Sequence, residues 1–166
     1  MKDWLHSAFS GLMPLTPTSN KPLRAHPELA PRCEAYLQKL VSSTSGVTAA
    51  LVVTSDGFKV ASVLHNELSP EKMAAMTSSM PALGEAVLSE ANLTDCQNVV
   101  IESNGGLIIK LAVGDPKKEL LLSVITNGQA MLGQVLWAAR QCCERVRFAV
   151  TPAPVHPSST VNDVSL

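Results

Sequence analysis

The chain has 166 residues, of which 46% are hydrophobic, 16% are charged and 4% are aromatic, and its formal net charge is −1. This length predicts one compact domain with short appendages, and the apolar content is sufficient for a core. The balanced charge and the few aromatic residues exclude the basic face and the stacking platforms that bind nucleic acid. No apolar run approaches the ~18 residues of a membrane-spanning helix. The charged fraction lies below the roughly 25% of an ordinary domain, which indicates that a partner covers part of the surface.

The cysteines argue against a metal centre or a disulfide framework. There are four of them, without a CxxC pair: Cys33, Cys96, Cys142 and Cys143. All but Cys96 fall in helical patterns. We therefore expect buried free thiols, no metal and no cofactor. Free thiols fit a reducing compartment, and the first residues lack the pattern of a secretory signal, so we expect a cytoplasmic protein.

Proline divides the chain into three parts. Five prolines fall between residues 14 and 31, and three more fall between residues 152 and 157. Proline fixes φ and lacks a backbone donor, so both stretches are expected to be extended linkers or tails. The predicted organisation is an N-terminal extension over 1–27, a folded domain over 28–147 and a flexible Pro/Ser-rich tail over 148–166.

A short apolar segment precedes the proline-rich linker. If it is helical, one face carries Trp4, Leu5, Ala8, Phe9 and Leu12. Two interpretations remain open: a disordered end with scattered apolar residues, or a short docking segment that orders only against a surface. A helix of this length is marginal alone in water, so the second interpretation requires a receiving groove.

The first predicted elements are a helix over 28–42 and a hairpin. The strands cover 47–54 and 58–64, joined by Ser55-Asp56-Gly57, a sequence typical of a tight turn.

A second helix is predicted from Pro70, with Ser69 as its N-cap, to about residue 91. Its apolar positions extend around too much of the cylinder for one sheet to cover. We therefore expect a homodimer interface on this helix. Its predicted residues are Met73, Met76, Met80, Leu83 and Val87. Pro81 lies inside this helix, where proline is expected to produce a kink.

The last elements are three strands and a helix. The strands are expected at 99–103, 107–113 and 120–126, with a hairpin turn at Asn104-Gly105. A third helix is expected from an Asn127 cap to Arg147. The order α-β-β-α-β-β-β-α predicts an α+β fold in which helices sandwich a five-stranded antiparallel sheet.

No catalytic motif accompanies this pattern. Gly128 and Gly133 have the spacing of a phosphate loop, but Gln134 stands where the loop needs lysine. There is no nucleophile elbow or zinc-protease motif, and we interpret Glu85 and Glu90 as solvated helix charges. The sequence therefore predicts a protein that is not an enzyme.

Residues 46–53 (GVTAALVV) and 55–62 (SDGFKVAS) resemble the opening hairpin of the roadblock/LC7 domain family. Residues 99–102 (VVIE) and the helix after Thr126-Asn127 are similar to that family's second half. The resemblance covers about 28–147 and departs from the family at Pro81 and in both ends. It implies a profilin-like fold, with one helix on one face of the sheet and two on the other. It also implies that two copies pair through the central helix and the neighbouring edge strand, which adds Val99 and Ile101 to the predicted interface.

The resemblance also implies a function. Members similar to the bacterial gliding-motility regulator are homodimeric adaptors that bind and regulate a small Ras-like GTPase, as GTPase-activating proteins or as scaffolds. The alternatives are a purely structural scaffold or dynein-light-chain-like assembly subunit, and a small-ligand sensor. No site residue transfers from the family. Arg140, Arg145 and Arg147 are interpreted as partners of a helix dipole, so any activation is expected to reorder the GTPase rather than insert an arginine.

Overall fold

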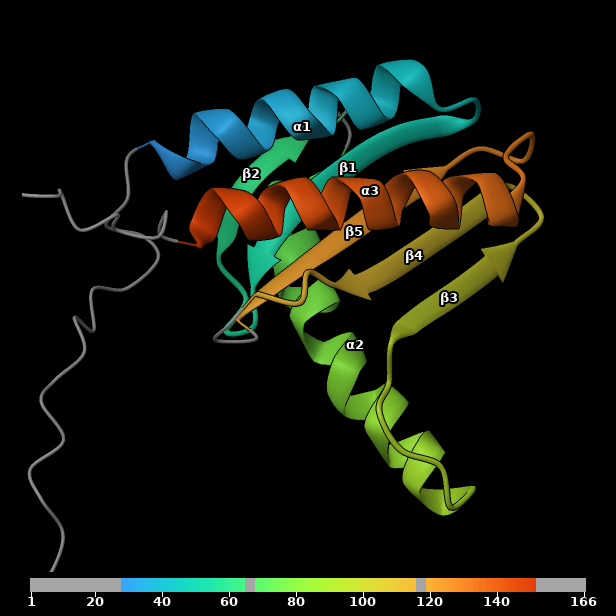
Figure 1. Cartoon of the computed structure of the whole chain (residues 1–166). Helices are drawn as coiled ribbons and strands as arrows, with labels where there is room; N and C mark the ends of the chain where they lie inside the picture. Colours follow the sequence, from blue (N-terminus) through green and yellow to red (C-terminus); the bar gives the residue numbers. More distant parts are fainter. Residues whose placement is uncertain (1–27, 65–67, 116–118, 152–166) are drawn as a thin grey trace, which may run out of the picture.

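The computed structural model describes residues 28–64, 68–115 and 119–151. The predicted element order is confirmed (Figure 1). The elements are α1 (Leu29–Ser43), β1 (Val47–Thr54), β2 (Lys59–Val63), α2 (Pro70–Glu90), β3 (Asn98–Ser103), β4 (Gly106–Ala112), β5 (Leu120–Thr126) and α3 (Leu132–Val150). The predicted extension over 1–27, with its docking segment, and residues 152–166 lie outside the described residues.

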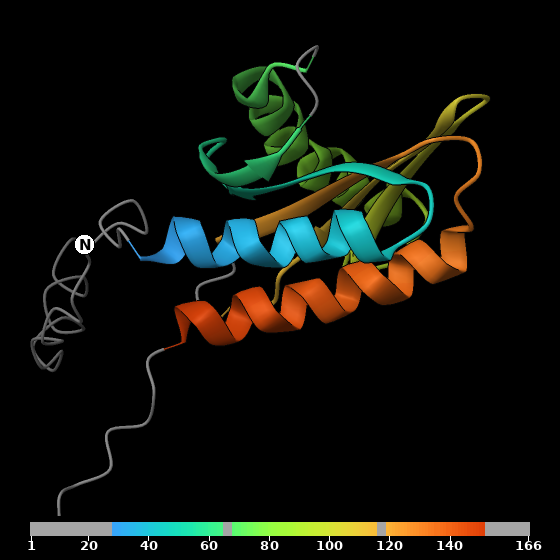
Figure 2. The ribbon, with the colours of Figure 1, turned by 90° about the horizontal axis from the view of Figure 1, so that it is seen from above.

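One antiparallel sheet of five strands forms the centre of the domain, in the order β2-β1-β5-β4-β3. Helices α1 and α3 lie side by side on one face, and α2 lies on the other (Figures 1 and 2). Strands β2 and β3 are the two edges of the sheet. The predicted α+β sandwich is therefore confirmed.

The main core lies between the sheet and the pair α1 and α3. Each helix buries residues that recur at intervals of three or four, as one face of a helix must. From the helices the core takes Leu29, Cys33, Leu37, Leu40, Val135, Ala139, Cys142, Cys143 and Val146. Alternate residues of the central strands, among them Val52, Ile109 and Leu122, face them. Burial of each large aliphatic side chain contributes roughly 1.5–3 kcal/mol.

The core on the α2 side is much smaller. It consists of Leu51, Val53, Ala74 and Leu121, with Met73 and Leu64 packed against it. Of the 21 residues of α2, only Ala74 and Thr77 are buried, and both lie in its first half. The second half of α2 therefore has little cover from its own chain.

The third helix differs from the prediction at both ends. It begins at Leu132 rather than after Asn127, and it continues to Val150, beyond the predicted end at Arg147. The amide of Asn127 donates to the carbonyl of Gly46 (2.8 Å), while its side-chain oxygen accepts from the amide of Gln129 (3.0 Å). These bonds hold a non-helical turn against the start of β1.

The predicted cap of α2 at Ser69 is present, since its hydroxyl accepts from the amide of Lys72 (3.3 Å).

Candidate interaction surface

An exposed apolar surface covers the α2 side of the molecule. Its five most exposed large side chains are each 47% to 68% exposed. We call this set the α2–β3 surface: Met76, Leu83, Val87, Leu93 and Ile101. Isolated apolar side chains are ordinary on protein surfaces, but a contiguous apolar area marks a contact site.

The sequence of α2 explains why its apolar side faces away from the sheet. Its inward positions carry mostly small residues, so the helix packs closely without burying large side chains. Gly84 is the clearest case, since a Cβ there would lie 2.5 Å from Sγ of Cys96 and 3.2 Å from Cγ2 of Val99. The larger Met76, Leu83 and Val87 are left exposed.

The structure distributes the predicted interface residues unevenly. Met76, Leu83, Val87 and Ile101 are exposed. Met73 is half-buried and packs against the chain's own small core. Met80 and Val99 are half-buried.

Two isoleucines extend this surface across the sheet and were not predicted. The strand register aligns Ile101 with Ile108, and Ile108 with Ile125. Aligned residues on neighbouring strands share one face, and here that face is the α2 side. Ile108 and Ile125 are only half-buried. Both strands are near-continuous apolar runs, which predicts cover on both faces of the sheet, and this is the signal that could have identified the two isoleucines.

Strand β3 contributes a free edge next to this surface. Among the described residues it pairs only with β4, over Asn98 to Ser103. The outward amides and carbonyls of an edge strand form a ready template for another strand. An apolar helix face and an open strand edge therefore lie together on one side of the domain.

Lys110 is an unexpected feature below α2. It is 1% exposed on β4, and the register places it between Val99 and Ser123, on the α2 face. Burial lowers the pKa of Lys110, and the nearby Cys96 and Glu85 partly oppose that effect. On the same side of the sheet, the hydroxyls of Thr77 and Ser123 are buried without a hydrogen-bond partner among the described residues.

These elements and their order agree with comparisons against known proteins. A model of the Roadblock/LC7 domain matches residues 35–126. The chain belongs to the Roadblock/LC7 family. Two uncharacterized proteins of Methanocaldococcus jannaschii, MJ0714 and MJ1340, are 26% and 24% identical to it over 107 residues. Each alignment covers 64% of this chain, and 87% and 90% of the two relatives.

Solved structures share the fold at low identity. A Roadblock/LC7 domain from Streptomyces avermitilis is 21% identical, with a TM-score of 0.62, over 69% of this chain and 93% of that one. MglB from Myxococcus xanthus is 15% identical, with a TM-score of 0.63, over 74% and 93%. Profilin IA from Acanthamoeba castellanii is 12% identical, with a TM-score of 0.51, over 69% and 96%. The profilin-like architecture is therefore confirmed.

The buried thiols of this Roadblock/LC7 domain are poor nucleophiles and poor metal ligands. Burial raises the pKa of Cys33 and Cys142 to about 11 and that of Cys143 to about 12. Such thiols stay protonated at neutral pH, and the thiolate is the form that attacks electrophiles and binds metals. Within 28–64, 68–115 and 119–151 no group of three or more His, Cys, Asp or Glu side chains is placed to hold a metal ion. No helix in those ranges is long and apolar enough to cross a membrane.

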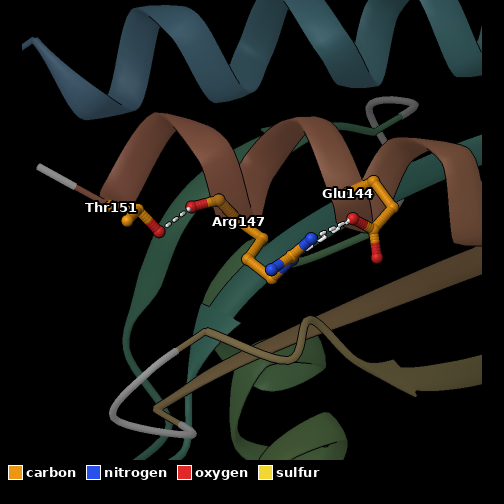
Figure 3. Close-up of polar contacts among 3 residues, drawn as sticks. All are labelled: Glu144, Arg147 and Thr151. Carbon is orange, nitrogen blue, oxygen red and sulfur yellow. Dashed lines mark hydrogen bonds and ion pairs between the residues drawn. The ribbon is translucent and has the colours of Figure 1, made fainter. Parts of the chain in front are cut away.

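The clustered arginines lie on α3, on the other face of the sheet from α2 (Figure 1). Arg147 forms an ion pair with Glu144, with 2.5 Å between Nη2 and Oε2, and the hydroxyl of Thr151 donates to its carbonyl (Figure 3). Its guanidinium also lies 4.8 Å from the centre of the Phe148 ring. Arg147 is therefore held by its own helix, remote from the α2–β3 surface.

Proposed function

We propose that this Roadblock/LC7 protein is a non-catalytic homodimeric adaptor of the cytoplasm that binds and regulates a small Ras-like GTPase. The observation that carries the proposal is the α2–β3 surface beside an open strand edge. Large apolar side chains exposed at 47% to 68% favour a second protein as their cover.

A two-fold arrangement uses both features at once. Antiparallel pairing of β3 with its copy satisfies the edge, and the same rotation brings the two α2 helices together. The second half of α2 carries two charged residues, Glu85 and Glu90. The carboxylate of Glu85 accepts a hydrogen bond from the amide of Cys96 (2.9 Å), which ties it to its own loop. Little charge therefore has to be desolvated in such an interface.

A substitution in the exposed stripe tests the dimer. Leu83→Glu places a carboxylate in the proposed contact, where burial of an unpaired charge is costly. We expect the wild type to be a dimer at micromolar concentration by light scattering, and Leu83→Glu to be a monomer. Ala82→Glu is the matched control, because residue 82 is exposed on the same helix but lies outside the apolar stripe. A monomeric wild type with a native far-ultraviolet spectrum contradicts the dimer.

The GTPase partner is supported by membership of the Roadblock/LC7 family and by the MglB structures that share the fold. An assembly component with an apolar surface and no catalytic motif is suited to modulate another protein's chemistry. The decisive measurement uses purified chain and a Ras-like GTPase from the same organism. We expect no phosphate release from GTP by the chain alone, and saturable binding to the GTPase that Leu83→Glu weakens at least tenfold. Binding without any change in GTP hydrolysis would reduce the role to scaffolding.

A further inference from the structure

Helices α1 and α3 lie side by side on the face of the domain opposite α2 (Figure 2), and a groove lies between them, lined by residues of both. It is an open hollow of about 250 Å³. Its walls combine apolar and aromatic side chains, among them Tyr36, Leu40, Trp137 and Ala138, with cationic and uncharged polar ones, among them Lys39 and Arg145.

Trp137 is the unusual member of this groove. It is 67% exposed, although Val135 and Ala139 beside it are fully buried. Phe148 is also 67% exposed and stands eleven residues further on, three turns along the same side of α3. Aromatic side chains carry large apolar area and dominate contact energies, so the exposed Trp137 at the groove favours an apolar occupant. Phe148 extends the same side of α3 beyond the residues that line the groove.

The chain itself contains a segment of matching chemistry. Residues 1–13 hold the apolar stripe Trp4, Leu5, Phe9 and Leu12. Recognition of an apolar helix face by a groove is a common mode of peptide binding. The segment of residues 152–166 offers no aromatic residue.

The tether between this segment and the groove is long enough. Residues 14–27 join the segment to the start of α1, and a proline-rich chain of that length reaches about 43 Å. Helix α1 has 15 residues and is only about 22 Å long, so any part of the groove is within reach. A short tether gives an effective concentration in the millimolar range, so weak intrinsic affinity is sufficient.

We propose that residues 1–13 dock as an amphipathic helix in the groove between α1 and α3 of their own chain. The stripe of the segment then covers Trp137, and the receiving groove supplies the order that a short helix lacks alone.

The two tryptophans of the chain stand on opposite sides of the proposed contact, which makes fluorescence a direct test. Trp4→Phe leaves Trp137 as the only reporter, and deletion of residues 1–13 does the same. We expect the deletion to shift the emission of Trp137 to longer wavelength and to raise its quenching by acrylamide at least twofold. Equal emission and quenching in the two proteins would overturn the proposal.

Matched charge substitutions separate docking from a general effect of the segment. In the Trp4→Phe background, Leu5→Glu with Phe9→Glu alters the stripe, whereas Ser7→Glu with Ser10→Glu adds the same charge to the other side of the helix. The stripe pair should reproduce the deletion, and the serine pair should leave Trp137 protected. An equal response to both pairs contradicts helix docking.

Crosslinking identifies the occupant. With p-benzoyl-phenylalanine in place of Trp137, irradiation of a mixture of ¹⁵N-labelled and unlabelled chains should join position 137 to residues 1–13 of the same isotopic chain. Crosslinks to residues 152–166, or between labelled and unlabelled chains, would overturn the proposal. Helix α2 lies on the other face of the sheet, so this result is independent of the dimer (Figure 1).

Discussion

Lys110 carries its ammonium group into a layer of the domain that is otherwise largely apolar. Its cross-strand neighbours are Val99 and Ser123, and its pKa is lowered chiefly because burial disfavours the charged form. No ion pair within 4 Å involves Lys110 among the described residues. A buried charge without a close partner opposes folding. Lys110 therefore lowers the stability of the protein, and the apolar core compensates for that loss.

We expect Lys110→Met to stabilise the protein by about 1–2 kcal/mol at pH 7 in urea unfolding, since methionine has a similar length and no charge to desolvate. The pKa of Lys110 in the folded state lies below the ordinary lysine value of 10.5, because burial disfavours the charged form. The unfolded chain therefore binds more protons between the two pKa values, and wild-type stability rises with pH through that window. The advantage of methionine should shrink as the pH approaches 10.5.

Lys59→Met is the control for this prediction, because Lys59 is exposed on β2 and its replacement should change stability by less than 0.5 kcal/mol. A Lys110→Met protein that is less stable than the wild type would show that the charge of Lys110 is favourably compensated, with Glu85 as the nearby acidic group.

The elements differ in how far their residues predicted them. Tight turns have characteristic residues that can be recognised in a sequence. Gly57 and Asn104-Gly105 therefore allowed four of the five strands to be predicted to within about one residue. The start of α3 was predicted wrongly because Asn127 has two uses: it is a good cap, and it also terminates a strand. The bond from its amide to Gly46 decides between them, and that contact spans 81 positions of the chain. No local pattern contains it.

The sequence predicted some residues of the candidate surface and missed others. The excess of apolar positions on α2 pointed to Leu83 and Val87, since a single sheet covers only one side of a helix. The burial of Lys110 could not be predicted from the sequence, because strand register and the path of α2 decide which face of β4 is covered. The groove beside Trp137 depends on the relative placement of α1 and α3, which the sequence of either helix does not specify.

Gly84 provides a test of how α2 and the following loop fit together. An added methyl group would lie 2.5 Å from Sγ of Cys96, closer than atoms can approach. We expect Gly84→Ala to destabilise the protein by about 1–2 kcal/mol despite the better helix propensity of alanine. Cys96→Ala removes the sulfur, so the double variant should recover most of that loss in a double-mutant cycle of urea unfolding.

Gly133→Ala is the matched control, because α3 leaves nothing within 4 Å of an added Cβ there. That substitution should stabilise the protein by up to about 1 kcal/mol through helix propensity alone. Additive effects of Gly84→Ala and Cys96→Ala would contradict a direct steric contact.

At the scale of the whole molecule, the sheet separates two surfaces. The α2 face presents the α2–β3 surface and an open strand edge, and the opposite face presents the groove between α1 and α3 (Figures 1 and 2). A dimer formed through the first surface leaves the second free on both copies. The two proposals therefore assign self-association and the docking of residues 1–13 to opposite faces of the domain.

This separation bears on how the proposed regulation of a GTPase works. Activation by an inserted arginine places a guanidinium against the transferred phosphate and accelerates hydrolysis by 10³–10⁵-fold. The clustered arginines are Arg140, Arg145 and Arg147, all on α3, and Arg147 is already engaged by Glu144 and Phe148. We expect the triple change of these arginines to alanine to alter any stimulation of GTP hydrolysis less than tenfold, measured as phosphate release at saturating adaptor. The exposed Arg147–Glu144 pair contributes less than about 1 kcal/mol, so the variant should stay folded. A loss of stimulation of 10³-fold or more, with binding and dimer mass unchanged, would instead assign an arginine of α3 to the transition state.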